Sequence, residues 1–142
     1  FHGRSDLSVE LGGVMLGHHG RDALGEYVVV ETYVPALRAK GRAATLTFDH
    51  ETWREINAIK DESFPDLQVI GWYHTHPGYG IFLSGFDRFI DDNWFKTGHH
   101  IAAVFDPTLK MPEALGVFIW AGDGSGRLRS GFASCEPLGE RQ

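Results

Sequence analysis

The sequence has 142 residues, the size of one domain. Hydrophobic residues make up 42% and aromatic residues 13%, enough for a packed core, which excludes a disordered chain. Asp and Glu total 19 against 13 Lys and Arg, and the resulting net charge of −6 disfavours general binding to nucleic-acid backbones. No apolar run approaches the roughly 18 residues of a membrane span.

The cysteine content limits the chemistry further. Cys135 is the single cysteine, so an internal disulfide and a cysteine-rich zinc cluster are both excluded. This fits a reducing compartment, and we expect the cytoplasm. The chain begins at Phe1, which suggests a processed or excised piece. We expect a single domain over 1–142, with a core at about 9–121 and a strand or tail at 122–142.

Strands are expected to dominate the first third of the chain, because β-branched and aromatic residues gather there. The expected elements are a frayed end at 1–13, a short strand at 14–16 closed by a turn at 18–20, a strand at 26–34, an exposed loop at 36–42 and a strand or hairpin arm at 44–48.

Two helices are expected after these strands. Asp49 is a candidate N-cap for a helix over about 50–60. Ser84 begins a second helix that Gly98 ends. Apolar residues at helical spacing are expected to lie in the core: Trp53, Ile56 and Ile59 in the first helix, and Phe86, Phe89, Ile90 and Trp94 in the second.

The remaining strands are expected at 67–73, 101–105, 115–120 and, as an edge strand, 127–132. Strands and helices are mixed without a regular alternation, which indicates an α+β fold. We therefore expect a mixed, curved β-sheet flanked by helices.

One group of polar residues stands out for its chemistry. His74 and His76 are two apart at the end of an expected strand, so strand alternation puts both imidazoles on one face. Asp87 follows in the first turn of the next helix, after a glycine-rich loop. Two His and one carboxylate leave a fourth tetrahedral position for water, as in catalytic zinc sites. Ser84 and Asp87 also fit an ordinary capping box, which requires no function.

The stretch 74–87, HTHPGYGIFLSGFD, resembles the signature of the JAMM/MPN+ (JAB) zinc metalloproteases. The strand 69–73 before it and the segment 10–17, ELGGVMLG, resemble the same family. The resemblance covers about 9–120. It is nearest to the proteasome-lid deubiquitinase and signalosome deneddylase types, and it leaves a prokaryotic member open.

This resemblance implies an MPN/JAMM fold with a cytidine-deaminase-like core and a single catalytic Zn²⁺. By the same likeness, His74, His76 and Asp87 bind the metal. Glu10 acts as general base and then as general acid. Ser84 donates a hydrogen bond to the tetrahedral oxyanion.

The resemblance also implies a substrate class. The predicted reaction is hydrolysis of an isopeptide or peptide bond after the C-terminus of ubiquitin or a ubiquitin-like protein. The substrate's tail is expected to pair as a β-strand with the segment from Val34 to Leu46. Arg38, Lys40 and Arg42 in that segment are either contacts for an acidic partner or a solvated basic loop. A partner subunit, or the rest of a longer chain, is a further expectation.

Three other functions stay open at this point. The chain could process a sulfur-carrier-like ubiquitin homologue, which the motif does not distinguish from deconjugation. It could be a non-catalytic MPN scaffold, although such scaffolds usually lack some of the ligands. A third alternative is a DNA-repair-associated member of the fold, which the acidic composition disfavours.

Several conspicuous residues are not assigned a function. The pairs at 18–19 and 99–100 are histidines without a carboxylate at useful spacing, so loop or strand-edge positions are expected. Asp91 and Asp92 are expected on the solvated face of their helix. Cys135 has no neighbouring histidine motif and is not expected to be a catalytic thiol.

Overall fold

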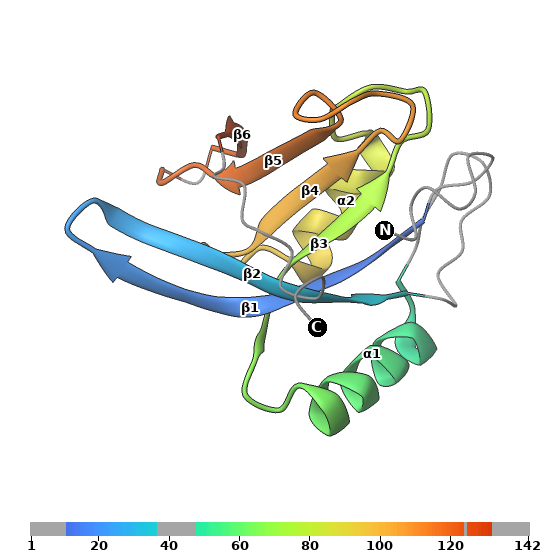
Figure 1. Ribbon diagram of the computed structural model, residues 1–142, viewed down its shortest axis with the longest axis vertical. Helices are drawn as coiled ribbons and strands as arrows, with labels where there is room; N and C mark the ends of the chain where they lie inside the picture. The colour runs from blue at the N-terminus through green and yellow to red at the C-terminus, as the bar shows by residue number, and fades with distance from the viewer. Residues whose placement is uncertain (1–10, 37–47, 124, 132–142) are drawn as a thin grey trace.

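A computed structural model describes residues 11–36, 48–123 and 125–131 (Figure 1). These residues form a six-stranded sheet in the order β2-β1-β3-β4-β5-β6 and two helices. The elements are β1 (Gly12–Asp22), β2 (Gly25–Pro35), α1 (His50–Ser63), β3 (Gln68–Thr75), α2 (Gly85–Trp94), β4 (Ile101–Phe105), β5 (Leu115–Trp120) and β6 (Arg127–Ser130).

The sheet is mixed, because one of its strand pairs is parallel. Strands β3 and β4 run in the same direction, and the chain between them crosses over through α2. The other neighbouring strands are antiparallel. A parallel pair needs a long crossover connection, and here that connection carries the glycine-rich loop and α2.

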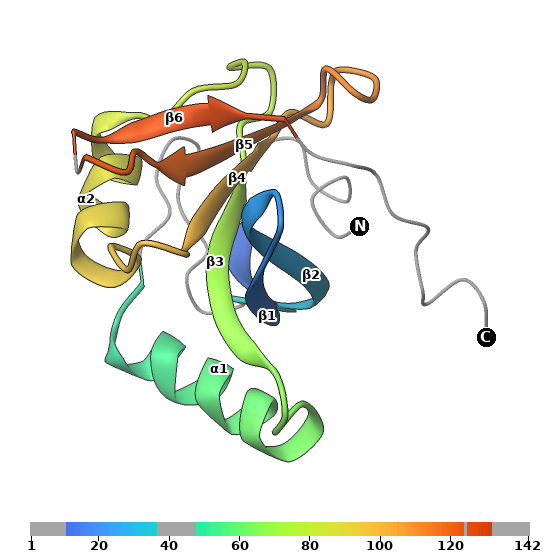
Figure 2. The ribbon, with the colours of Figure 1, turned by 90° about the vertical axis from the view of Figure 1, so that its left-hand side faces the viewer.

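The core is divided between the two faces of the sheet. On one face, Ile56 of α1 and Ile90 of α2 pack with strand residues such as Val14 and Trp72. Figure 2 shows α1 and α2 lying against this face. Alternation sends the next residues along the strands, Met15 and Tyr73, to the opposite cluster.

The sheet is curved, as expected. The second cluster, which forms around Ile70 of β3, is joined by Val28 of β2 and by Val117 of β5. These two strands are separated in the sheet by β1, β3 and β4. The cluster therefore extends along this face from β2 to β5. Figures 1 and 2 show that the strands curve as they cross the sheet.

The predicted α+β class, with a mixed sheet flanked by helices, is confirmed. Strands β4 and β5 have the predicted bounds, and β6 is an edge strand, as expected. Asp49 caps α1, and its carboxylate accepts a hydrogen bond from the backbone N–H of Thr52 at 2.8 Å. Helix α1 extends three residues beyond the predicted end at 60. The predicted strand at 44–48 lies outside the described residues except for Phe48, which is buried and belongs to no strand.

The prediction for the first hairpin was wrong in one respect. Strand β1 does not end at Gly17, and the expected turn at 18–20 is part of the strand, which continues to Asp22. A register shift between Leu16 and Gly17 lets the long hairpin continue, and the actual turn connects Asp22 with Gly25. Polar residues in 18–20 suggested a turn because this end of the hairpin is exposed.

The predicted apolar face of α2 was also partly wrong. Ile90 is buried, but Phe86 and Phe89 are 61% and 65% exposed, and Trp94 is largely exposed too. The buried face instead contains Asp87 and Asp91 beside Ile90. Helical periodicity places residues correctly relative to one another, but it assumes that the buried side is the apolar side, and this helix buries two carboxylates.

No helix among the described residues is long and apolar enough to cross a membrane.

Candidate metal centre

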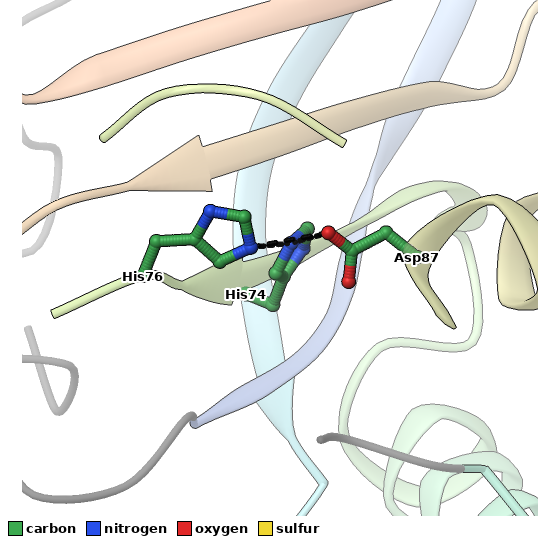
Figure 3. Close-up of side chains that lie close together, drawn as sticks. All are labelled: His74, His76 and Asp87. Carbon is green, nitrogen blue, oxygen red and sulfur yellow. Dashed lines mark hydrogen bonds and ion pairs between the residues drawn. The ribbon is translucent and has the colours of Figure 1, made fainter. Parts of the chain in front are cut away.

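Three side chains converge on one point beside the sheet (Figure 3). The Nε2 atom of His74 lies 3.0 Å from Nε2 of His76 and 3.0 Å from Oδ2 of Asp87. The Nε2 atom of His76 is 3.1 Å from the same carboxylate oxygen. The three atoms thus form a nearly equilateral triangle, as the sequence predicted for these residues. No other group of three or more His, Cys, Asp or Glu in the described part of the chain could hold a metal ion.

Strand β3 fixes the two histidines. His74 pairs in register with Val104 of β4, and the backbone N–H of His76 donates to the carbonyl of Phe105 at 2.8 Å. Thr75 between them donates its backbone N–H to the carbonyl of Leu11. His74 therefore lies in an interior strand of the sheet and His76 directly follows that strand, and both side chains are fully buried.

The first turn of α2 fixes the carboxylate. Ser84 is the N-cap, and its Oγ accepts from the backbone N–H of Asp87 at 3.2 Å. Asp87 Oδ2 in turn accepts from the backbone N–H of Ser84 at 2.7 Å. The capping box and the histidine cluster thus share one carboxylate. The hydroxyl proton of Ser84 is not used in this capping bond, because Oγ acts there as the acceptor.

A backbone carbonyl sets the protonation of the second imidazole. Nδ1 of His76 lies 3.1 Å from the carbonyl oxygen of Gly80. A carbonyl oxygen can only accept, so Nδ1 carries the proton and, in the neutral ring, Nε2 carries the lone pair. His74 differs, because its buried Nδ1 has no hydrogen-bond partner among the described residues. Its ring instead stacks on Trp72, with centroids 4.5 Å apart and planes 12° apart.

The electrostatics of the cluster favour a bound cation. Burial lowers the pKa of His74, which keeps that ring neutral. Burial acts to raise the pKa of Asp87, but hydrogen bonds from the His74 ring and from the backbone N–H of Ser84 hold it below its ordinary value. A buried, ionised carboxylate therefore faces two imidazoles, and at least one lone pair on His76 points at it.

The donor set fits zinc. With bonds of about 2.0–2.1 Å, tetrahedral zinc separates its ligand atoms by about 3.3 Å, close to the triangle observed here. Two imidazole nitrogens and one carboxylate oxygen fill three positions and leave the fourth open to water or substrate. These residues could therefore hold the metal without a large rearrangement.

Other sequence predictions about function lie outside the described residues. Glu10 is one of them, as are Arg38, Lys40 and Arg42. The predicted tail-binding segment begins at the end of β2, where Val34 is buried, and most of it is likewise outside. Cys135 is also outside.

The remaining histidines form no such centre in the described part of the chain. His18 lies 2.8 Å from Glu31, and His19 stacks on His99 with centroids 3.9 Å apart. His18 and His19 belong to β1, and His99 and His100 precede β4. These pairs match the expected strand and loop positions.

Sequence reasoning missed one buried ion pair beside the site. Asp92 is exposed, as predicted, but the prediction that Asp91 is also solvated was wrong. Arg127 donates to both carboxylate oxygens of Asp91 at 2.7 Å, and Trp72 Nε1 donates to Asp91 Oδ1 at 2.8 Å. Arg127 comes from β6, far along the chain, so no local pattern indicates the pair. The position of Asp91 one turn after Asp87 is the one available hint.

Comparison with known proteins finds subunits of the proteasome and of the COP9 signalosome among the relatives. The chain is 30% identical over 109 residues to the 26S proteasome regulatory subunit RPN11 of Candida glabrata. It is 31% identical over 111 residues to COP9 signalosome complex subunit 5 of Oryza sativa subsp. japonica. Each match covers 75% of this chain, and the chain spans about a third of the length of these relatives.

Two solved structures share the fold. Protein DSY2949 from Desulfitobacterium hafniense has a TM-score of 0.62 at 19% identity. The match covers 91% of this chain and 80% of the DSY2949 chain. A protein from Salinibacter ruber has a TM-score of 0.54 at 21% identity, with 91% and 79% covered. The family model described as JAB1/Mov34/MPN/PAD-1 ubiquitin protease matches residues 2–93. The chain therefore belongs to the JAB/MPN family.

Proposed function

We propose that this chain is a zinc-dependent peptidase that cleaves after the C-terminus of ubiquitin or a ubiquitin-like protein. The observation that carries the proposal is the buried triangle of His74, His76 and Asp87. The family description names a ubiquitin protease, and the relatives are subunits of the proteasome and the signalosome, which supports this substrate class.

A bound zinc ion would polarise the scissile carbonyl and lower the pKa of water at the open position. The protein's residues would supply the rest. Glu10 would accept a proton from that water and later deliver it to the departing amine. Ser84, whose hydroxyl proton is free of the capping bond, would donate to the oxyanion. His74, His76 and Asp87 would hold the metal.

The setting of the reaction belongs to the same proposal. The substrate's extended tail would lie along the segment from Val34 to Leu46 as an added β-strand. Because the relatives are named as subunits of the proteasome and the signalosome, a partner subunit or the rest of a longer chain would deliver the substrate. We expect a cytoplasmic location, on the grounds of the single cysteine.

Two substitutions test the chemistry. The full chain is incubated with isopeptide-linked ubiquitin conjugates and with linear ubiquitin-like fusions, and its zinc content is measured in parallel. Glu10→Gln is expected to keep zinc and to lose turnover by about 10²–10⁴-fold, the usual contribution of a general base. His76→Ala is expected to lose both.

Glu62→Gln provides the matched control, because Glu62 is an exposed residue near the end of α1. This variant should keep both zinc and turnover. Full activity in Glu10→Gln would refute the role of general base. A folded wild-type chain that fails to retain stoichiometric zinc would favour a non-catalytic scaffold. Cleavage of the linear fusions alone would favour processing of a sulfur-carrier-like homologue.

A further inference from the structure

The loop 77–81 between His76 and α2 is held by a single buried carboxylate. Asp106 follows β4 and is 2% exposed. Its Oδ1 accepts from the backbone N–H of Gly78 at 3.0 Å, and its Oδ2 accepts from the backbone N–H of Gly80 at 3.1 Å. Thr108 donates its backbone N–H and its hydroxyl to Oδ1, at 2.9 and 2.6 Å.

These bonds bend the loop into one conformation. Gly78 and Gly80 have φ angles of +78° and +86°, a left-handed region that favours glycine. In this conformation the N–H of Gly80 points at Asp106 and its carbonyl points at Nδ1 of His76. One residue thus connects a buried carboxylate to the ring of a candidate metal ligand.

The connection matters because the two imidazoles are held differently. His74 stacks on Trp72, whereas its Nδ1 has no hydrogen-bond partner among the described residues. His76 has the carbonyl of Gly80 on its Nδ1. Such outer bonds fix the tautomer and the orientation of a metal-binding imidazole, and their loss typically costs about 10–100-fold in metal affinity.

We propose that Asp106 is a positioning residue for His76 and acts through the backbone of Gly80. By fixing this glycine, Asp106 keeps the proton of His76 on Nδ1 and leaves the Nε2 lone pair directed at the metal position. The inference rests on the proposed function only for its consequence, which is metal affinity. The orientation of the ring is a property of the metal-free chain as well.

The decisive variant is Asp106→Asn. The amide oxygen would take the Oδ1 position, where it keeps the donors of Gly78 and Thr108. The amide NH₂ would then face the N–H of Gly80, and two donors cannot bond. The substitution therefore breaks the one bond that leads to His76. Thr108→Val is the matched control, because it removes a hydroxyl bond to Asp106 and leaves Gly80 in place.

Two measurements on the full-length chain decide the matter. Zinc affinity, measured by competition with a chelator, should fall by about 10–100-fold in Asp106→Asn and change by less than about threefold in Thr108→Val. The ring ¹⁵N shifts of His76 in the metal-free chain should indicate a proton on Nδ1 in wild type and in Thr108→Val. In Asp106→Asn they should indicate a mixture of tautomers.

The outcomes separate this inference from the proposed function. Unchanged zinc affinity and unchanged ring shifts in a folded Asp106→Asn chain would overturn the positioning role, and so would equal losses in both variants. A wild-type chain that binds no zinc would overturn the proposed function, and its ring shifts would still decide the positioning role.

A second pair of variants applies should Asp106→Asn not fold. Gly80→Ala and Gly78→Ala both place a side chain at positive φ, and a Cβ at either position meets nothing within 4 Å. The carbonyl of Gly80 accepts from His76. Weaker zinc binding and altered His76 shifts are therefore expected in Gly80→Ala beyond those in Gly78→Ala, and equal effects would overturn the positioning role.

Discussion

Helix α2 buries two carboxylates one turn apart, and the two have different partners. Asp91 is 1% exposed and meets the guanidinium of Arg127 through two bonds of 2.7 Å. Asp87 is 2% exposed and meets two imidazoles and the backbone N–H of Ser84. Asp91 therefore has a permanent positive partner within the protein, and Asp87 has none among the residues that the structure describes.

A buried charge must be compensated, and the difference between the two residues shows how. Arg127 is charged at every accessible pH, so the Asp91 pair is complete in the folded chain. Beside Asp87, burial lowers the pKa of His74 and keeps its ring neutral. A metal ion would supply a positive charge there, and the three converging atoms are suited to bind one. By this criterion Asp91 has a structural role, whereas Asp87 is part of the candidate metal centre.

Trp72 connects Asp91 with His74, which in turn contacts Asp87. Its Nε1 donates to Asp91 at 2.8 Å, and its ring stacks on His74. The complete ion pair thus lies directly behind the candidate metal centre. The stacked Trp72 ring holds the His74 ring in place, because Nδ1 of His74 has no hydrogen-bond partner among the described residues.

Substituting Asp91 should produce the largest effect on stability. Asp91→Asn keeps an acceptor for Trp72 but leaves Arg127 buried without a counter-charge. Removing one partner of a buried pair usually costs about 3–5 kcal/mol, so the free energy of unfolding in urea should fall by about that amount. A loss below about 1 kcal/mol would contradict the structural role assigned to the pair.

The same substitution one turn earlier should act on metal binding instead. Asp87→Asn keeps an acceptor for the N–H of Ser84, so the metal-free chain should lose less free energy of unfolding than Asp91→Asn loses. Zinc affinity should fall by about 100-fold or more, equivalent to about 2.7 kcal/mol. Calorimetric titration measures the loss of zinc affinity. Equal zinc affinity in Asp87→Asn and wild type would contradict the role of Asp87 in metal binding.

Zinc should stabilise the two chains unequally. A ligand at about 100 times its Kd adds about 2.7 kcal/mol to the free energy of unfolding. Wild type should therefore gain this amount, and Asp87→Asn should gain little at the same zinc concentration. Thermal unfolding with and without zinc provides the measurement, and an equal gain in both chains would place the metal elsewhere.

The smallest effect on stability and zinc affinity is expected at Asp92, which follows Asp91 in α2. Its side chain is 57% exposed and lies 3.8 Å from Lys96. Asp92→Asn should change the free energy of unfolding by less than about 0.5 kcal/mol and leave zinc affinity unaltered. A larger change in either quantity would contradict the claim that only the buried carboxylates of α2 contribute to stability or zinc binding.

Local patterns in the sequence predicted much of this molecule. Hydrophobic runs predicted β4 and β5 with their bounds, and the caps Asp49 and Ser84 predicted where the helices begin. Spacing within β3 and the capping signal at 84–87 brought together His74, His76 and Asp87. These features depend on residues close in sequence, which is why the pattern contains them.

The features that were missed depend on distant residues. The ion pair of Asp91 requires Arg127 from β6, and the loop bonds of Asp106 require the glycines after β3. Helix α2 also buries the side that contains Asp87 and Asp91. The prediction assumed that the apolar side is buried, so it assigned Phe86 and Phe89 to the wrong face. Only the folded structure shows which buried charges have an oppositely charged partner inside the protein.

The most direct test of the account is a zinc titration of the metal-free wild-type chain beside Asp87→Asn and Asp91→Asn. The account predicts one zinc per wild-type chain, one zinc per folded Asp91→Asn chain, and no saturable binding in the same concentration range for Asp87→Asn. A wild-type chain without a zinc site, or an Asp87→Asn chain that binds zinc as tightly as wild type, would contradict it.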